Sequence, residues 1–199
     1  MNIIMTGSTS FVGAATVREL LRRGHTVTAI VRPKSSKLDT ILEGNEEALL
    51  SGRLLVTEND LSEPEKLLEK VTKPQDVFCH FGWGGSGSAS RTDKALQEKN
   101  MEISLETVRT AEALGCKKFL FSGSQAEYGM HQDLITEDAV CEPKSLYGEA
   151  KLAMREKGEK LCDELGLRYI HARIFSAYGP GDHPWTLVES CLEDRKSVV

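Results

Sequence analysis

Short apolar runs and longer amphipathic stretches alternate along the chain. Residues 2–6 form an apolar run that ends at Gly7, and residues 11–22 repeat apolar positions with a helical period until Gly24. Residues 26–31 are rich in β-branched side chains, which favour extended backbone. The pattern predicts a strand, a glycine turn, a helix and a second strand, which together make the βαβ unit of a parallel sheet.

The same alternation continues downstream. Residues 32–52 are polar and predict a loop with one short helix. Residues 82–90, rich in glycine and serine, predict a loop within the domain that passes close to a ligand, with a linker between domains as the alternative. The other predicted strands are 53–57, 76–81, 117–122 and 168–175, and the other predicted helices are 62–71 (N-capped by Ser62), 94–114 and 145–165. We therefore expect an α/β fold, a Rossmann-like doubly wound parallel sheet that binds ligands at the carboxyl ends of its strands.

Composition narrows the class of protein. A chain of 199 residues suffices for one α/β domain, and its net charge of −5 argues against a nucleic-acid or anionic-membrane partner. No apolar run approaches the roughly 20 residues of a membrane span, and no signal-peptide pattern precedes the first strand, so we expect a cytoplasmic protein. The five cysteines are scattered and form no C-x-x-C pair, which argues against a disulfide framework and against a metal site.

The first turn between a strand and a helix has the pattern of a phosphate-binding turn. It reads Thr-Gly-Ser-Thr-Ser-Phe-Val-Gly, in which Gly7 permits a tight turn and Gly13 lets the helix pack closely on the strand. Ser10 stands where many dinucleotide-binding turns have a second glycine and is small enough for close backbone approach. Because N–H groups at a helix N-terminus bind pyrophosphate, we expect a dinucleotide on Gly7, Ser10, Phe11, Val12 and Gly13.

The end of the second predicted strand indicates which dinucleotide is bound. NAD sites usually place a carboxylate there for the ribose 2′-hydroxyl, whereas NADP requires positive charge for its 2′-phosphate. The chain reads Val31-Arg32-Pro33-Lys34 and has no acid at this point. We therefore favour NADP(H) over NAD(H), with Arg32 and Lys34 as the phosphate ligands; the alternative is a solvated basic loop.

Tyr147 and Lys151 are the strongest candidates for catalysis. Their spacing of four places both side chains on one face of the predicted helix 145–165, one turn apart. A neighbouring ammonium favours the ionised form of a phenol, which makes the tyrosine usable as a general acid or base. A Tyr-x-x-x-Lys pair also occurs by chance on surface helices, so the pair needs support from other segments.

Taken together, these segments resemble the extended short-chain dehydrogenases/reductases, the NAD(P)-dependent epimerase/dehydratase family that acts mainly on nucleotide sugars. The resemblance runs from Met1 to about Pro184. It also includes these segments: Asp60-Leu61, His80-Phe81-Gly82, Asn100, the serine-rich segment 121–129 that ends in Tyr-Gly, and the turn 173–181.

The resemblance implies roles for individual residues. Tyr147 would be the acid/base, Lys151 would hold the nicotinamide ribose, and Ser124 would hydrogen-bond the substrate oxygen at the reacting carbon. Further cofactor contacts are implied at Asp60, Leu61, Phe81, Gly82, Trp83, Asn100 and Phe175. His80 is more typical of a packed strand-end histidine than of a catalyst, and Ser122 of a structural serine.

Departures from the family pattern narrow the chemistry. The 4,6-dehydratases of the family carry an Asp-Glu pair where this chain has Gln125 and Ala126, so we do not expect dehydration. Glu127 follows one step later, where the alternation of an extended segment would turn it away from the site. Ser176 replaces an asparagine common in nucleotide-sugar members. The remaining reactions are 4-epimerisation and 4-keto reduction of a nucleotide sugar, and the expected NADP favours reduction. The alternative is a non-catalytic NAD(P)-binding module or an inactive fragment.

The resemblance also implies a second domain. We expect residues 1–184 to form the NAD(P)-binding Rossmann domain and residues 185–199 to be the truncated start of a smaller substrate domain. Residues 194–199 break the amphipathic pattern before them and are expected to be non-native; a natural short form is the alternative. Family members often dimerise through the helices that precede the fifth and sixth strands, which makes a homodimer an expectation here.

Overall fold

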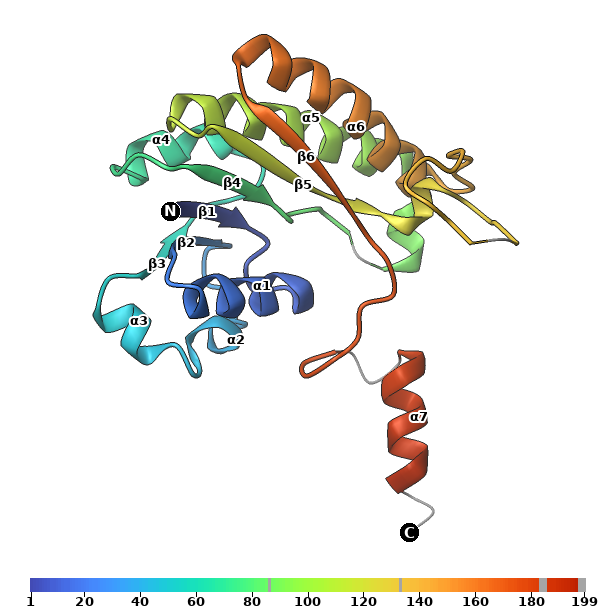
Figure 1. The fold of residues 1–199 in the computed structure, drawn as a ribbon, viewed down its shortest axis with the longest axis horizontal. Helices are drawn as coiled ribbons and strands as arrows, with labels where there is room; N and C mark the ends of the chain where they lie inside the picture. The colour runs from blue at the N-terminus through green and yellow to red at the C-terminus, as the bar shows by residue number, and fades with distance from the viewer. Residues whose placement is uncertain (86, 133, 183–185, 197–199) are drawn as a thin grey trace.

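A computed structural model describes residues 1–85, 87–132, 134–182 and 186–196. It contains a six-stranded parallel sheet with strand order β3-β2-β1-β4-β5-β6, which confirms the predicted Rossmann-like fold (Figure 1). The strands are β1 (Asn2–Thr6), β2 (Thr26–Val31), β3 (Leu54–Glu58), β4 (Val77–His80), β5 (Lys118–Ser124) and β6 (Arg168–Ile174). The order in which the chain adds strands reverses between β1 and β4, because β2 and β3 lie on one side of β1 and β4, β5 and β6 on the other. Such a switch point opens a ligand crevice beyond the carboxyl ends of the strands.

Helices cover both faces of the sheet. Figure 1 shows α1 (Phe11–Arg22), α2 (Asp39–Leu42) and α3 (Glu46–Leu50) on one face, and α4 (Leu67–Lys70), α5 (Lys94–Ala113) and α6 (Leu146–Leu165) on the other. Short 3₁₀ turns are η1 (Pro64–Lys66), η2 (Ser88–Thr92) and η3 (Gln125–Glu127). The last helix, α7 (Leu187–Lys196), stands apart from the sheet in the same view. None of the helices within the described ranges is long and apolar enough to cross a membrane.

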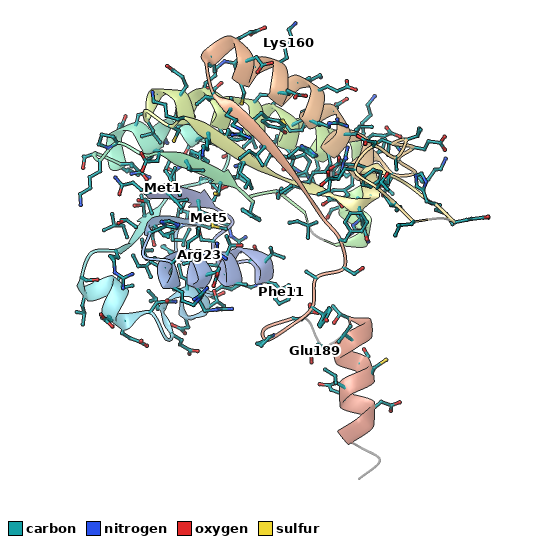
Figure 2. The ribbon with its side chains drawn as sticks, viewed as in Figure 1. Met1, Met5, Phe11, Arg23, Lys160 and Glu189 are labelled. Atoms are coloured by element: carbon teal, nitrogen blue, oxygen red, sulfur yellow. The ribbon has the colours of Figure 1, made fainter. Side chains whose placement is uncertain are left out.

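Each face of the sheet has its own core because successive strand residues point to opposite sides. Ile4 packs with Phe78, Phe119 and Met154 under α5 and α6. Its neighbours in β1 point the other way: Met5, for example, is fully buried and lies in the layer between the sheet and α1 (Figure 2). Burial on both faces explains why the central strands are continuous apolar runs rather than alternating ones.

Side-chain caps fix where the long helices begin. Ser10 accepts a hydrogen bond from the Gly13 N–H at the start of α1, Asp93 does the same for α5, and Ser145 accepts from the Gly148 N–H at the start of α6. Gly166, with a φ of 72°, ends α6 in the left-handed conformation. These caps place the N-termini of α1 and α6 at the carboxyl edge of the sheet.

Two predicted segments differ from the structure. The loop 32–52 contains two short helices, α2 and α3, instead of one. The helix predicted over residues 62–71 is a 3₁₀ turn followed by the single turn of α4, and Ser62 is not its N-cap, because the Ser62 hydroxyl donates to Asp60 Oδ1 at 2.7 Å.

The expectations for the end of the chain fall partly on residues outside the described ranges. Residues 183–185, where the predicted domain boundary lies, and residues 197–199 are among them. Within the described part, α7 continues through Lys196 and so includes the first three residues of the segment expected to be non-native.

Candidate active site

A cleft of about 370 Å³ opens at the carboxyl ends of β1, β2 and β4. It contains eight of the residues predicted to bind the cofactor, and they are Gly7, Ser10, Arg32, Asp60, Leu61, Phe81, Gly82 and Trp83. Residues that the sequence did not single out also line it, among them Lys37, Asn59 and Gly84. The cleft lies at the switch point of the sheet, which is where folds of this type bind nucleotides.

The turn before α1 is shaped to receive a phosphate. Gly7 has a φ of 69°, and a Cβ added there would lie 2.7 Å from the carbonyl carbon of Phe81. A Cβ at Gly13 would collide with the Gly7 carbonyl oxygen, so both glycines are required for the close approach of turn and helix.

The N-terminus of α1 leaves donors available. Within the described residues, the N–H groups of Phe11 and Val12 have no hydrogen-bond acceptor, whereas that of Gly13 is bound by Ser10 Oγ at 3.1 Å. Phe11 begins the helix at this edge of the sheet (Figure 2). Two unsatisfied amides at the positive end of a helix fit a pyrophosphate.

The end of β2 presents one of the two predicted cations to the cleft. Arg32 lines the cleft and so does Lys37, but Lys34 is not among its lining residues. Lys34 has a φ of 56°, and its backbone N–H donates to Glu58 Oε1 at 3.3 Å. The basic character of the cleft therefore comes from Arg32 and Lys37.

Asp60, another residue that lines the cleft, is held in one orientation. Its Oδ1 atom accepts hydrogen bonds from the hydroxyl and the backbone N–H of Ser62, and these bonds lower the pKa of the Asp60 carboxyl below its usual value. Leu61 contacts Gly82 so closely that a Cβ on that glycine would lie 2.7 Å from Leu61 Cδ1.

Two polar residues near β4 support the backbone instead of entering the cleft. Asn100, a predicted cofactor ligand, binds both the N–H and the carbonyl of Gly84 at 2.9 Å and is not among the cleft-lining residues. His80 is fully buried between Thr6 Oγ1 at 2.8 Å and Ser104 Oγ at 3.1 Å. Burial, with a smaller contribution from Lys151, lowers the pKa of His80 to about 3, so it is a neutral packing residue, as the sequence indicated.

Lys151 lies in an aromatic enclosure under the edge of the sheet. Its Nζ donates to the Ser122 carbonyl at 2.7 Å and lies 3.9 Å from the ring centre of Trp83 and 4.5 Å from that of Phe121. The residue is only 2% exposed, and this burial lowers the pKa of its ammonium to about 7, with the Glu127 carboxylate acting in the opposite direction. Burial of a cation favours its neutral form, whereas the carbonyl and the two rings stabilise the charge.

Tyr147 lies one turn before Lys151, as predicted, with its ring centre 5.7 Å from the ammonium. The Trp83 indole meets the tyrosine ring edge-on at 6.2 Å, and the Arg91 guanidinium lies over the ring at 5.2 Å. Trp83 thus contacts both members of the predicted pair and also lines the cofactor cleft. It connects the cleft to the predicted reaction centre.

Ser124 is the last residue of β5, two positions after the Ser122 carbonyl that holds Lys151. It is also the N-cap of η3, where its hydroxyl accepts from the Ala126 N–H at 3.2 Å. Phe175, predicted to meet the nicotinamide, is 47% exposed after β6, packs against Tyr128 and is not among the residues that line the cleft.

A buried ionic network lies behind Ser124. The Glu127 carboxylate is fully buried and accepts from the Ser124 N–H at 2.7 Å, from His171 Nε2 at 2.9 Å and from Arg173 Nε at 2.7 Å. Burial raises the pKa of Glu127, but the bonds from His171, Arg173 and Ser124 outweigh it and hold the pKa below its usual value. Glu127 bonds to side chains of β6, and it lies on a 3₁₀ turn rather than on the extended backbone from which its direction was predicted.

The arrangement can perform proton transfer beside a nucleotide cleft. The Tyr147 phenol lies next to the buried ammonium of Lys151, and the Ser124 hydroxyl lies at the carboxyl end of β5. These groups are those required to move a proton at a carbinol oxygen and to hydrogen-bond the developing oxyanion.

Comparisons with known proteins identify the family of the chain. Residues 3–194 match the model of the NAD dependent epimerase/dehydratase family. The chain is 29% identical over 178 residues to D-erythronate dehydrogenase of Cupriavidus necator, an alignment that covers 87% of this chain and 53% of the relative. It is 27% identical over 188 residues to UDP-glucose 4-epimerase 3 of Oryza sativa subsp. japonica, covering 89% and 49%.

A solved structure of a relative has a similar fold. The UDP-glucose 4-epimerase of Thermotoga maritima with UDP-glucose superposes with a TM-score of 0.77 at 25% identity, covering 94% of this chain and 59% of that one. The chain thus spans about half the length of these curated relatives and about three fifths of that structure. Because the family model matches nearly the whole sequence, the chain belongs to the NAD dependent epimerase/dehydratase family.

Proposed function

We propose that the protein is an NAD(P)-dependent oxidoreductase or epimerase that acts on a nucleotide sugar, with Tyr147 as its acid/base. The observation that carries this proposal is the position of Lys151, buried beside the Tyr147 ring and hydrogen-bonded to the Ser122 carbonyl. A surface Tyr-x-x-x-Lys pair without function would have no reason to bury an ammonium among aromatic rings.

The cleft fits a dinucleotide. The free amides of Phe11 and Val12 would bind the pyrophosphate, and Asp60 and Leu61 would contact the adenosine half. Trp83, which lines the cleft, and Lys151, which contacts Trp83, would meet the nicotinamide half. The bound nicotinamide would supply the hydride donor or acceptor. Arg32 and Lys37 at the cleft favour NADP(H) over NAD(H), because no carboxylate ends β2.

The residues around Tyr147 define the proton chemistry. The Tyr147 phenol gives or takes the proton of the substrate hydroxyl, and the Ser124 hydroxyl hydrogen-bonds the same substrate oxygen. The ammonium of Lys151 favours the phenolate and would hold the nicotinamide ribose. Gln125 and Ala126 offer no acid for the elimination of water, so 4-keto reduction or 4-epimerisation remains, and the basic cleft favours reduction.

A second candidate is a non-catalytic NAD(P)-binding module. The observation that favours it is that the chain spans 53% of D-erythronate dehydrogenase and 59% of the Thermotoga maritima epimerase. In this view residues 1–184 form a domain that binds the cofactor without turning over a substrate. The first proposal uses the same division, with residues 1–184 as the cofactor domain and residues 185–199 as the start of a substrate domain.

Titrations with NADPH and with NADH, monitored by the fluorescence of the nicotinamide, separate these two proposals. The protein is then assayed on a panel of nucleotide-4-keto-sugars with the cofactor that binds. Binding with turnover supports the enzyme, and binding without turnover supports the module. Failure to bind either cofactor contradicts both.

A further inference from the structure

Arg91 stands out among the residues around Tyr147. It belongs to η2, its side chain is exposed, and its guanidinium carbon lies 5.2 Å from the centre of the Tyr147 ring. Within the described residues it makes no hydrogen bond and no ion pair, whereas Arg22 and Arg109 are paired with glutamates on their own helices. Arg91 therefore presents a guanidinium whose N–H groups are available to a ligand beside the proposed acid/base.

The backbone that carries Arg91 is held on both sides. Gln97 donates to the Ser90 carbonyl at 2.7 Å, and the Asp93 N–H donates to the same carbonyl at 3.3 Å. A Cβ on Gly85 would lie 2.6 Å from Ser90 Cβ, so the loop is closely packed against itself. The backbone of this turn is therefore ordered before a ligand binds, and binding has to order only the Arg91 side chain.

The same hydrogen bonds connect Arg91 to the reaction centre. Gln97 also accepts from the Trp83 indole N–H at 3.0 Å, and Trp83 contacts both Tyr147 and Lys151. Arg91 and Lys151 are thus two cations in contact with one tyrosine ring, one exposed and one buried. Of the carboxylates around these two cations, Glu127, which acts on Lys151, is paired with Arg173, and Asp93, two residues after Arg91, accepts from the Leu96 N–H and makes no ion pair with Arg91. The charge balance at this point favours an anionic ligand.

We propose that Arg91 binds a carboxylate carried by the sugar itself, next to the carbon at which Tyr147 acts. The proposal rests on the proposed function, because it places the substrate at Tyr147. A guanidinium donates two parallel N–H groups that match the two oxygens of a carboxylate. The pyrophosphate of a nucleotide sugar is separated from C4 by the sugar ring, so the anion beside the reacting carbon belongs to the sugar. The substrate class is a uronic or aldonic acid, either nucleotide-linked or free.

Matched ligand pairs test this proposal on the whole chain. UDP-glucuronic acid is compared with UDP-glucose, and D-erythronate with erythritol, by isothermal titration with and without saturating NADPH or NADH. The carboxylate member of at least one pair is expected to bind about tenfold or more tightly than its neutral match. The first pair reports a nucleotide-linked acid and the second a free one.

Substitutions assign the preference to Arg91. Arg91→Gln is expected to abolish it and Arg91→Lys to retain part of it, because an ammonium cannot form the bidentate pair. Arg109→Gln, the same change on an exposed arginine of α5, is expected to leave it unchanged.

Two results would overturn the proposal: equal binding of acid and neutral ligands by the wild-type protein, or a preference that survives Arg91→Gln. The cofactor titration is read separately. Cofactor binding without a carboxylate preference removes the inference about Arg91 and leaves the proposed function standing. Absence of cofactor binding removes the proposed function, while the titrations without cofactor still judge Arg91.

Discussion

The Glu127 carboxylate binds the backbone N–H of Ser124 at 2.7 Å and the guanidinium of Arg173 at 2.7 Å, so one buried group links the end of β5 to β6. Gly123 makes room for this link, because a Cβ there would lie 2.7 Å from Glu127 Oε1. The position of Ser124 therefore depends on an ion pair formed with the next strand of the sheet.

Replacing Glu127 with Gln is expected to destabilise the protein strongly. The change leaves Arg173, whose side chain is 12% exposed, without a counter-charge, and loss of one partner of a buried pair costs about 3–5 kcal/mol. Urea denaturation measures the free energy of unfolding. Glu106→Gln, which removes the exposed partner of Arg109, should change it by less than about 1 kcal/mol. Equal effects of the two substitutions would contradict the importance of the buried link.

Lys151 makes the stability of the cofactor-free protein depend on pH. Burial lowers the pKa of its ammonium to about 7 in the folded state, below the value of about 10.4 in an unfolded chain. Between these values the unfolded state binds a proton that the folded state lacks, so the free energy of unfolding rises with pH. Below pH 7 both states are protonated, and this contribution no longer changes.

Denaturation curves from pH 6.5 to 9 measure this dependence. Lys151→Met should flatten the rise above pH 7, whereas Lys157→Met, on the exposed face of the same helix, should leave the slope as in the wild-type protein. Parallel pH profiles for wild type and Lys151→Met would show that Lys151 does not titrate in this range.

Tyr147→Phe is expected to reduce turnover by about 100-fold or more while changing the cofactor dissociation constant by less than about twofold. The substitution removes the proton-transferring hydroxyl and keeps the ring that contacts Trp83 and Arg91. Steady-state kinetics and cofactor titration measure the two effects. Tyr169→Phe serves as the control, because its hydroxyl binds the Met154 carbonyl and His171 Nδ1 in the core, and its loss should lower stability and reduce turnover far less than Tyr147→Phe does. Survival of activity in Tyr147→Phe would refute the assigned acid/base.

Arg32→Gln is expected to weaken NADPH binding about tenfold or more and to leave NADH binding within about twofold. The guanidinium lines the cleft and would pair with the 2′-phosphate, which NADH lacks. Lys34→Gln should have little effect on either cofactor, because Lys34 is not among the lining residues. Fluorescence titration of both variants shows which of the two cations binds the 2′-phosphate. If Arg32→Gln weakened NADH binding as much as NADPH binding, the proposed phosphate contact would be contradicted.

Gly7→Ala and Gly24→Ala separate backbone strain from steric collision. Both glycines have positive φ, 69° and 79°, so alanine at either position is strained by about 1–2 kcal/mol. A Cβ at Gly24 meets nothing within 4 Å, whereas one at Gly7 lies 2.7 Å from the Phe81 backbone. Gly7→Ala should therefore lower the unfolding free energy further and also weaken cofactor binding. Equal stability and cofactor affinity in the two variants would contradict the close packing of this turn.

The sequence predicted most of the fold because its signals are local. The bounds of β1, α1 and β2 match the prediction, since apolar runs and glycine stops specify them without help from distant residues. The helix predicted over 62–71 was wrong in extent because the Ser62 hydroxyl binds Asp60 rather than a helix N–H. A propensity for capping does not reveal a competing acceptor two residues upstream.

In the candidate site, the sequence indicated the residues that lie within one element but not the contacts between elements. Tyr147, Lys151 and the turn before α1 follow from spacing within one element. The link between Glu127 and Arg173 crosses from β5 to β6, and sequence spacing carries no signal for a contact between residues 46 positions apart. Arg91 and Lys37 lie outside the regular strands and long helices, where no periodicity points to the ligand side.

The link from Glu127 to β6 also orders events during protein synthesis. Ser124, Tyr147 and Lys151 leave the ribosome before Arg173, which follows Glu127 by 46 residues. Until β6 has been translated and has paired with β5, the Glu127 carboxylate lacks its counter-charge and the serine backbone lacks its fixed acceptor. A nascent chain that ends before Arg173 holds every proposed catalytic residue and still has no assembled site.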